Sequence, residues 1–212
     1  MPQTKEITTD FEWIRYAALD LGATDAKVIP TAEVVVENRV PLLCRSGCVT
    51  YGTRLTCPPR VPTPDEFRRI LSEYSYALLV QFTSDARADP DIICSLCRNI
   101  FDPEADPEQK QKASEFMDKY TGGNTGRLDI MLELEKKAFN GGCTFALAFV
   151  NGSCRLCKTC NLKEGTCLHP TRARIPEHAV GINMVKTAEK AGMPIHFPVT
   201  GSPRPMAILL LT

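Results

Sequence analysis

Four cysteines within residues 154–167 constrain this chain more than any other feature. Cys154, Cys157 and Cys160 have the spacing C-x2-C-x2-C, and Cys167 follows after six more residues. A turning backbone can bring thiols at this spacing into one small volume, which a cubane iron–sulfur cluster requires of its ligands. Disulfides between such near neighbours would be strained, and a tetrahedral zinc site usually takes its ligands as two separated pairs. This late set therefore favours a [4Fe-4S] cluster, with zinc as the alternative.

A second group of cysteines, the early set, consists of Cys44, Cys48 and Cys57 and spans fourteen residues. Glycine-containing turns flank it, and their backbone amides can donate hydrogen bonds to thiolates or cluster sulfides. Pro58 follows Cys57 directly, as proline often follows the last cysteine of a cluster motif. We interpret the early set as a second metal or cluster site. The alternative is a group of structural thiols, because free cysteine is among the most buried residue types.

Counting the thiols leaves the ligand assignment open. The late set supplies four ligands, enough for one complete cubane, whereas the early set supplies three. The early set therefore either leaves one iron open or takes a fourth ligand from Cys94, Cys97 or Cys143. Alternatively, Cys167 joins the early set, as the last cysteine of a tight run does in two-cluster ferredoxins. The same three extra cysteines also fit ordinary buried thiols.

Composition narrows the class of protein. Ten cysteines among 212 residues are too dilute for a disulfide scaffold. The N-terminal segment is polar, without the pattern of a signal peptide, so we expect a cytoplasmic protein with reduced thiols. The 25 basic and 25 acidic residues give a net charge of zero, which argues against nucleic-acid binding. No apolar run approaches the ~20 residues that cross a bilayer, so we expect no membrane association.

Hydrophobic patterning predicts a single α/β domain over residues 1–212, with a mixed sheet layered against helices and cysteine-rich loops that hold the clusters. Residues 63–66 (TPDE) are a strong helix start, with a Thr cap, Pro at the first helical position and Glu three residues after the cap. Residues 85–107 are acidic and proline-rich, and we expect an irregular insertion there. The other predicted helices are 11–21, 108–120, 127–140 and 178–191, and the predicted strands are 27–29, 33–37, 76–83, 143–150, 195–199 and 206–211. The last two strands are expected to pair as a terminal hairpin, and residues 121–126 (TGGNTG) as a turn.

Three blocks of this sequence resemble a known family. They are the block from Cys44 to Pro59, with Tyr51-Gly52 between its cysteines, the Glu135-x3-Phe139 segment before a Gly-Gly turn, and the block from Gly152 to Pro170. From about residue 39 to the C-terminus the chain is similar to a domain-of-unknown-function family of predicted metal-binding proteins, common in anaerobic bacteria and archaea. The resemblance implies metal or iron–sulfur binding and supplies no reaction. The chain departs from the family at residues 175–178, where the family tends to have a Met-Glu pair.

These observations support three hypotheses. The first is an iron–sulfur electron-transfer or redox accessory protein of anaerobic metabolism, with one or two [4Fe-4S] clusters and a redox partner protein. The second is an enzyme whose early cluster has an open iron for a small anionic substrate, held by Arg172 and Arg174. The third is a zinc-stabilised interaction module. His169 is an alternative ligand, whereas His178 and His196 have no partner at metal-ligand spacing and are expected to be structural.

Overall fold

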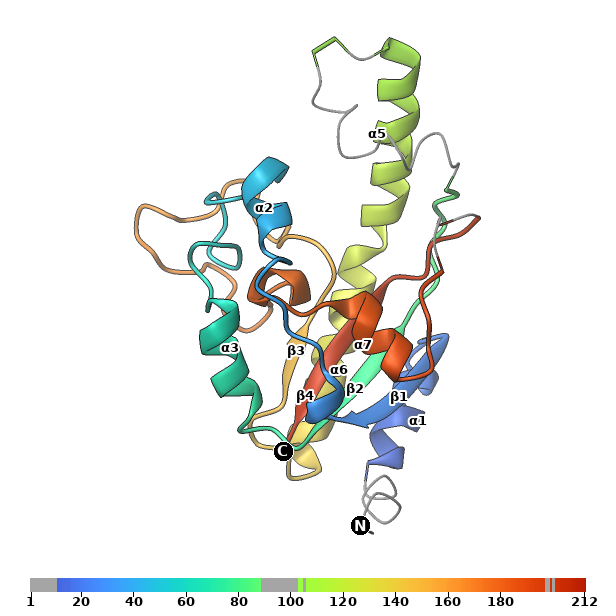
Figure 1. Cartoon of the computed structure of the whole chain (residues 1–212), viewed down its shortest axis with the longest axis vertical. Coiled ribbons are helices and arrows are strands. Elements are labelled where there is room, and N and C mark those ends of the chain that lie inside the picture. The colour runs from blue at the N-terminus through green and yellow to red at the C-terminus, as the bar shows by residue number, and fades with distance from the viewer. Residues whose placement is uncertain (1–10, 89–102, 105, 197–198, 200) are drawn as a thin grey trace.

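A four-stranded sheet forms the centre of the molecule (Figure 1). The structure is a computed structural model that describes residues 11–88, 103–104, 106–196, 199 and 201–212. The strand order is β1-β2-β4-β3, and each neighbouring pair is antiparallel. The strands are β1 (Asp25–Pro30), β2 (Tyr76–Gln81), β3 (Leu147–Phe149) and β4 (Met206–Leu211). The expected layering of helices on a sheet is confirmed, but the expectation of a mixed sheet is wrong.

Helices cover both faces of this sheet, which explains the error. Alternate side chains of β4 pack on opposite faces, so that Leu209 belongs to one core cluster and Ile208 to the other. The first face is covered by α1 (Glu12–Asp20) and α6 (Asn124–Asn140), and the second by α3 (Pro64–Leu71) and α7 (Met184–Lys190). A strand buried on both faces reads as a continuous apolar run, the pattern that parallel strands usually show. The sequence therefore did not reveal strand direction.

The predicted terminal hairpin is not formed by the described residues. The β4 strand lies between β2 and β3 and pairs with both, although Pro205 precedes it. Residues 195, 196 and 199 have no strand structure, and residues 197, 198 and 200 lie outside the described part. The strand expected at residues 33–37 is replaced by a 3-10 turn, η1 (Thr31–Glu33), and a single bridge between Val36 and Ile182.

Several local predictions can be compared directly. The helix start at residues 63–66 is confirmed, because Thr63 and Glu66 form a complete capping box. Helix α5 (Pro107–Gly122) is followed by α6 with only Gly123 between them, so the TGGNTG segment is largely helical. Figure 1 shows α5 extending beyond the sheet. Most of the proposed insertion at residues 85–107 lies outside the described residues.

Both cysteine regions lie in irregular segments beyond the sheet. The early set begins in the short helix α2 (Leu42–Gly47), and the late set follows β3 in a loop. In Figure 1, α2 stands close to this loop, although about a hundred positions separate them in the sequence. The 3-10 turn η2 (Glu177–Val180) follows the loop and precedes α7. The single helix expected at 178–191 is thus divided, because Gly181 has a φ of 94° and Asn183 caps α7.

Candidate metal centre

The four cysteines of the late set line one cavity. Part of its wall comes from residues 54–56 of the early loop. Its volume is about 20 Å³, which is room for about one water molecule. Cys167 lines this cavity with its sequence neighbours and does not line the cavity of the early set.

Backbone amides donate to two of the late thiols, whereas the sequence analysis expected such donors in the glycine-containing turns of the early set. The N–H of Leu55 lies 3.4 Å from the sulfur of Cys160, and the N–H of His169 lies 3.4 Å from that of Cys167. Such bonds favour the thiolate form of a cysteine and tune a bound metal. Arg54 donates to the carbonyl of Cys157 at 3.3 Å, which ties the two loops together. The early loop thus holds the late thiols in place.

Two buried polar atoms in the wall of the late cavity have no hydrogen-bond partner. They are Nε of Arg54 and Oγ1 of Thr56, and both residues line the cavity. Buried donors nearly always have hydrogen-bond partners, so two donors without partners need an explanation, such as a bound ion or ligand. Anionic thiolates and sulfides are acceptors that suit both donors. The chemistry of these donors therefore suits a thiolate-bound metal group, although the described side chains are not arranged as a metal-ion site.

The surroundings of Cys154 raise the pKa of its thiol. Burial raises it above its ordinary value, and the charges of Cys167, Cys157 and Cys160 raise it further, while the N–H of Leu156 lowers it. Crowded thiols of this kind stay protonated until a cation compensates their charge. Metal binding reverses this preference for the protonated form, because coordination deprotonates the thiol.

The early cysteines line a separate cavity of about 160 Å³. Cys44 and Cys57 are buried and Cys48 is exposed. The hydroxyl of Thr50 lies 3.1 Å from the sulfur of Cys48 and 4.0 Å from that of Cys57, so one side chain bridges two thiols. The pKa of Cys57 is raised, first by burial and then by the charges of Cys48 and Cys44, against the lowering effect of the Thr50 hydroxyl. The three early thiols therefore also form one group.

His178 lines the early cavity beside these thiols. Burial lowers its pKa, but hydrogen bonds to Cys44 and Glu177 raise it overall to about 10. Its Nδ1 lies 3.6 Å from Oε1 of Glu177, which also accepts a hydrogen bond from Asn151. A carboxylate behind an imidazole is the arrangement that orients a metal-binding histidine. The sequence analysis expected a structural His178, and the structure places this residue in the wall of the early cavity, within the segment that departs from the family pattern.

The other candidates occupy different places. Cys143 is buried in the core cluster beneath α1 and α6 and lines neither cysteine cavity. Cys94 and Cys97 lie outside the described residues. Arg172 pairs with Asp129, and Arg174 forms a two-point ion pair with Glu135. Because carboxylates occupy both guanidinium groups, these arginines are poorly placed to hold a substrate. The side chain of His169 lines neither cysteine cavity.

No group of three or more Cys, His, Asp or Glu side chains in the described residues has the arrangement of a metal-ion site. Among the helices that the structure describes, none has the length and apolar character needed to cross a membrane. All eight cysteines in the described ranges are free of disulfides.

The comparisons with known proteins agree with a metal site. No curated protein and no solved structure matches the chain. One protein family matches this chain over residues 27–211, a range that contains both cysteine sets. The chain therefore belongs to the DUF2284 family of predicted metal-binding proteins.

Proposed function

We propose that this protein binds two [4Fe-4S] clusters and transfers electrons to or from a redox partner protein. The observation that carries the proposal is the late cavity, where four thiols meet beside two buried donors that lack partners. The C-x2-C-x2-C spacing supports a cluster at this point. In the proposal Cys154, Cys157, Cys160 and Cys167 are its ligands. A bound cluster would supply one-electron chemistry.

At the early cavity we propose Cys44, Cys48 and Cys57 as ligands, with His178 as the fourth. The cavity is larger than that of the late set, and the imidazole lies at its wall. Histidine ligation of an iron–sulfur centre raises its potential relative to all-cysteine ligation. The two sites would then differ in potential. If His178 is not a ligand, the early cluster has an open iron, as the enzyme hypothesis requires.

Exposed apolar side chains near both sites support a protein partner. Leu42 and Leu43 lie on α2 and Val49 follows Cys48, while Leu168 follows Cys167. Leu43 is 75% exposed and Leu168 62% exposed. Large apolar residues gathered on a surface often mark an interaction site. Their position next to the cysteines suits a partner that exchanges electrons with the clusters.

Zinc in the late set is the second candidate, and the size of the late cavity favours it. A space of about 20 Å³ accepts a single ion more easily than a cubane, unless the loop moves outward. Four thiolates also form a closed tetrahedral site, as in structural zinc proteins. In that case only the early set would carry iron.

Anaerobic purification followed by iron, zinc and sulfide analysis tests these alternatives. The proposal predicts about eight irons and eight sulfides per chain, whereas zinc in the late set predicts one zinc and about four irons. A Cys157→Ser variant should lose at least half of the iron, while Cys143→Ser should lose none. Zinc without iron or sulfide would overturn the proposal.

The role of His178 has its own test. Labelling the histidines with ¹⁵N should change the nitrogen hyperfine coupling of the reduced early cluster, and His178→Ala should abolish that coupling. An unchanged spectrum together with full iron content would favour the open-iron enzyme. A shift of the signal when small ligands are added would strengthen that reading.

A further inference from the structure

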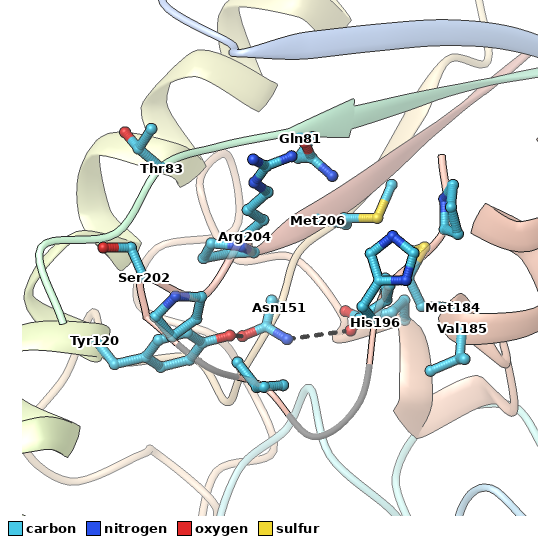
Figure 2. Close-up of a pocket in the computed structure, with 16 residues that line it drawn as sticks. Gln81, Thr83, Tyr120, Asn151, Met184, Val185, His196, Ser202, Arg204 and Met206 are labelled. Atoms are coloured by element: carbon cyan, nitrogen blue, oxygen red, sulfur yellow. Dashed lines mark hydrogen bonds between the residues drawn. The ribbon is translucent and has the colours of Figure 1, made fainter. Parts of the chain in front are cut away.

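A larger cavity lies on the other side of η2 from the early cysteines. Its volume is about 880 Å³, within the range of small-molecule sites. Figure 2 shows side chains from the end of β2, the start of β4, α5 and α7 around it. The apolar part of the wall includes Met184, Val185, Ile195 and Met206. Polar and charged side chains make up about half of the lining residues, among them Gln81, Glu177 and Arg204.

Gln81 presents an unpartnered amide to this cavity. The residue is only 7% exposed, yet its side-chain amide forms no hydrogen bond within the described part of the chain. An amide in the wall of a cavity can bond to a ligand that carries a matching donor or acceptor. Gln81 therefore points to a polar ligand group at the end of β2.

Arg204 adds a positive charge to the same wall. It lies between Pro203 and Pro205, whose rings fix the backbone on both sides of it. No ion pair involves Arg204 within the residues that the structure describes, and Figure 2 shows its side chain extending toward Gln81. A guanidinium beside an amide donor matches the two oxygens of a carboxylate.

The acidic residue of the cavity does not cancel this preference. Glu177 is buried, and its Oε1 accepts from Asn151, whose own oxygen accepts from the hydroxyl of Tyr120 at 3.1 Å. Figure 2 shows these two hydrogen bonds as dashed lines. Oε2 of Glu177 has no hydrogen-bond partner among the described residues, but protein atoms cover it, so neither oxygen is open to a ligand. Arg204, which is exposed, is a cation of the wall that a ligand can reach.

We propose that this cavity binds a small organic carboxylate with an apolar body. The carboxylate pairs with Arg204 and Gln81, and the apolar body packs against Met184, Ile195 and Met206. The ligand also lies close to the early cysteines, because Glu177 lines this cavity and the next residue, His178, lines theirs. Binding of the carboxylate does not depend on a metal. A role of this carboxylate as a substrate of the early site would rest on the function proposed above.

Titration calorimetry on the full-length, metal-loaded protein tests the proposal. The probes are hexanoate, phenylacetate and 4-phenylbutyrate, each compared with its neutral primary amide. Every carboxylate that binds should bind at least about tenfold more tightly than its amide, the factor that one charge-assisted hydrogen bond supplies. Arg204→Gln should remove that preference and leave amide binding unchanged. Arg87→Gln is the matched control, because Arg87 does not line the cavity, and it should behave like the wild type.

The outcomes separate the two proposals. If none of the three carboxylates binds, or if Arg204→Gln and Arg87→Gln bind them equally, the carboxylate site is refuted, whatever the iron content. If the carboxylates bind but no iron is present, only the cluster proposal fails. Gln81→Glu provides a second variant in case Arg204→Gln does not fold. It places a like charge beside the ligand and should abolish carboxylate binding while amide binding persists.

Discussion

Replacing Glu135 by Gln should destabilise the fold more than breaking an exposed ion pair does. Glu135 on α6 accepts from Nε of Arg174 at 2.6 Å and from the backbone N–H of Ala148 at 2.6 Å, and its second oxygen accepts from Nη2 of Arg174. The two side chains are only 12% and 14% exposed. This pair fastens the end of the late cysteine loop to α6 and to strand β3. It also gives a structural reason for the Glu135 segment that the sequence singled out.

The expected magnitude follows from burial. Removing one partner of a buried ion pair costs about 3–5 kcal/mol, because the other charge remains buried without compensation. Glutamine retains an acceptor for the Ala148 amide, so we expect a loss of about 3 kcal/mol, at the lower end of that range. For a chain of this length each kcal/mol lowers the melting temperature by about 2–4 °C, so the predicted decrease is about 6–12 °C.

Thermal and urea unfolding followed by circular dichroism measure this loss. Asp129→Asn is the matched control, since it breaks the exposed pair with Arg172, whose side chains are 55% and 44% exposed, and should cost less than about 1 kcal/mol. The double variant Glu135→Gln/Arg174→Met should recover part of the stability, because the stranded charge is gone. If Glu135→Gln costs no more than Asp129→Asn, the argument from burial is refuted.

Three further predictions concern other parts of the chain. Hydrogen bonds, led by that from Arg39, lower the pKa of Glu37 to about 2. The stabilising contribution of this carboxylate is therefore present above about pH 4.5 and lost as the pH falls toward 2. Urea unfolding between pH 2 and 6 should show that the stability of Glu37→Gln depends less on pH than that of the wild type. Gly181→Ala combines a φ of 94° with a new Cβ 2.8 Å from a proline ring and should lower stability by about 2 kcal/mol or more in denaturant unfolding, whereas Gly165→Ala, with open space around it, should cost only about 1 kcal/mol. Cys143→Ala should lower the melting temperature and leave metal content, measured by elemental analysis, unchanged, because this thiol packs in the core.

The sequence predicted those features whose determinants lie close together in the chain. The capping box of α3 depends on two residues three positions apart, and the strands β2 and β4 are short, nearly continuous apolar runs. Strand direction depends instead on which helices cover the sheet, and this information is spread over the whole chain. The division of the last predicted helix was missed for a related reason, because the turn at Gly181 packs against Pro64.

In the candidate site, too, the sequence predicted only what depends on residues close together in the chain. Spacing grouped the late thiols, but it left Cys167 unassigned, because a choice between two sets depends on how the loops fold. His178 lies beside the early cysteines, and Arg54 bonds to the late loop. Each of these contacts joins residues about a hundred positions or more apart in the sequence. Neither contact leaves a periodic signal. The Cys94 and Cys97 hypothesis lies outside the described residues and stays a prediction.

Each cysteine loop also forms part of the wall of the other loop's cavity. Residues 54–56 line the late cavity, while Gly152 and Ser153, just before the late run, line the early one. Metal binding orders the residues that form its site, so a metal in one cavity holds part of the second cavity in place. A Cys157→Ser variant that loses more than half of its iron would therefore be consistent with the ligands proposed here. The spectrum of the remaining cluster separates the two explanations of such a loss. If the early site is only weakened, its cluster keeps its own signal, whereas a wrong ligand assignment changes that signal.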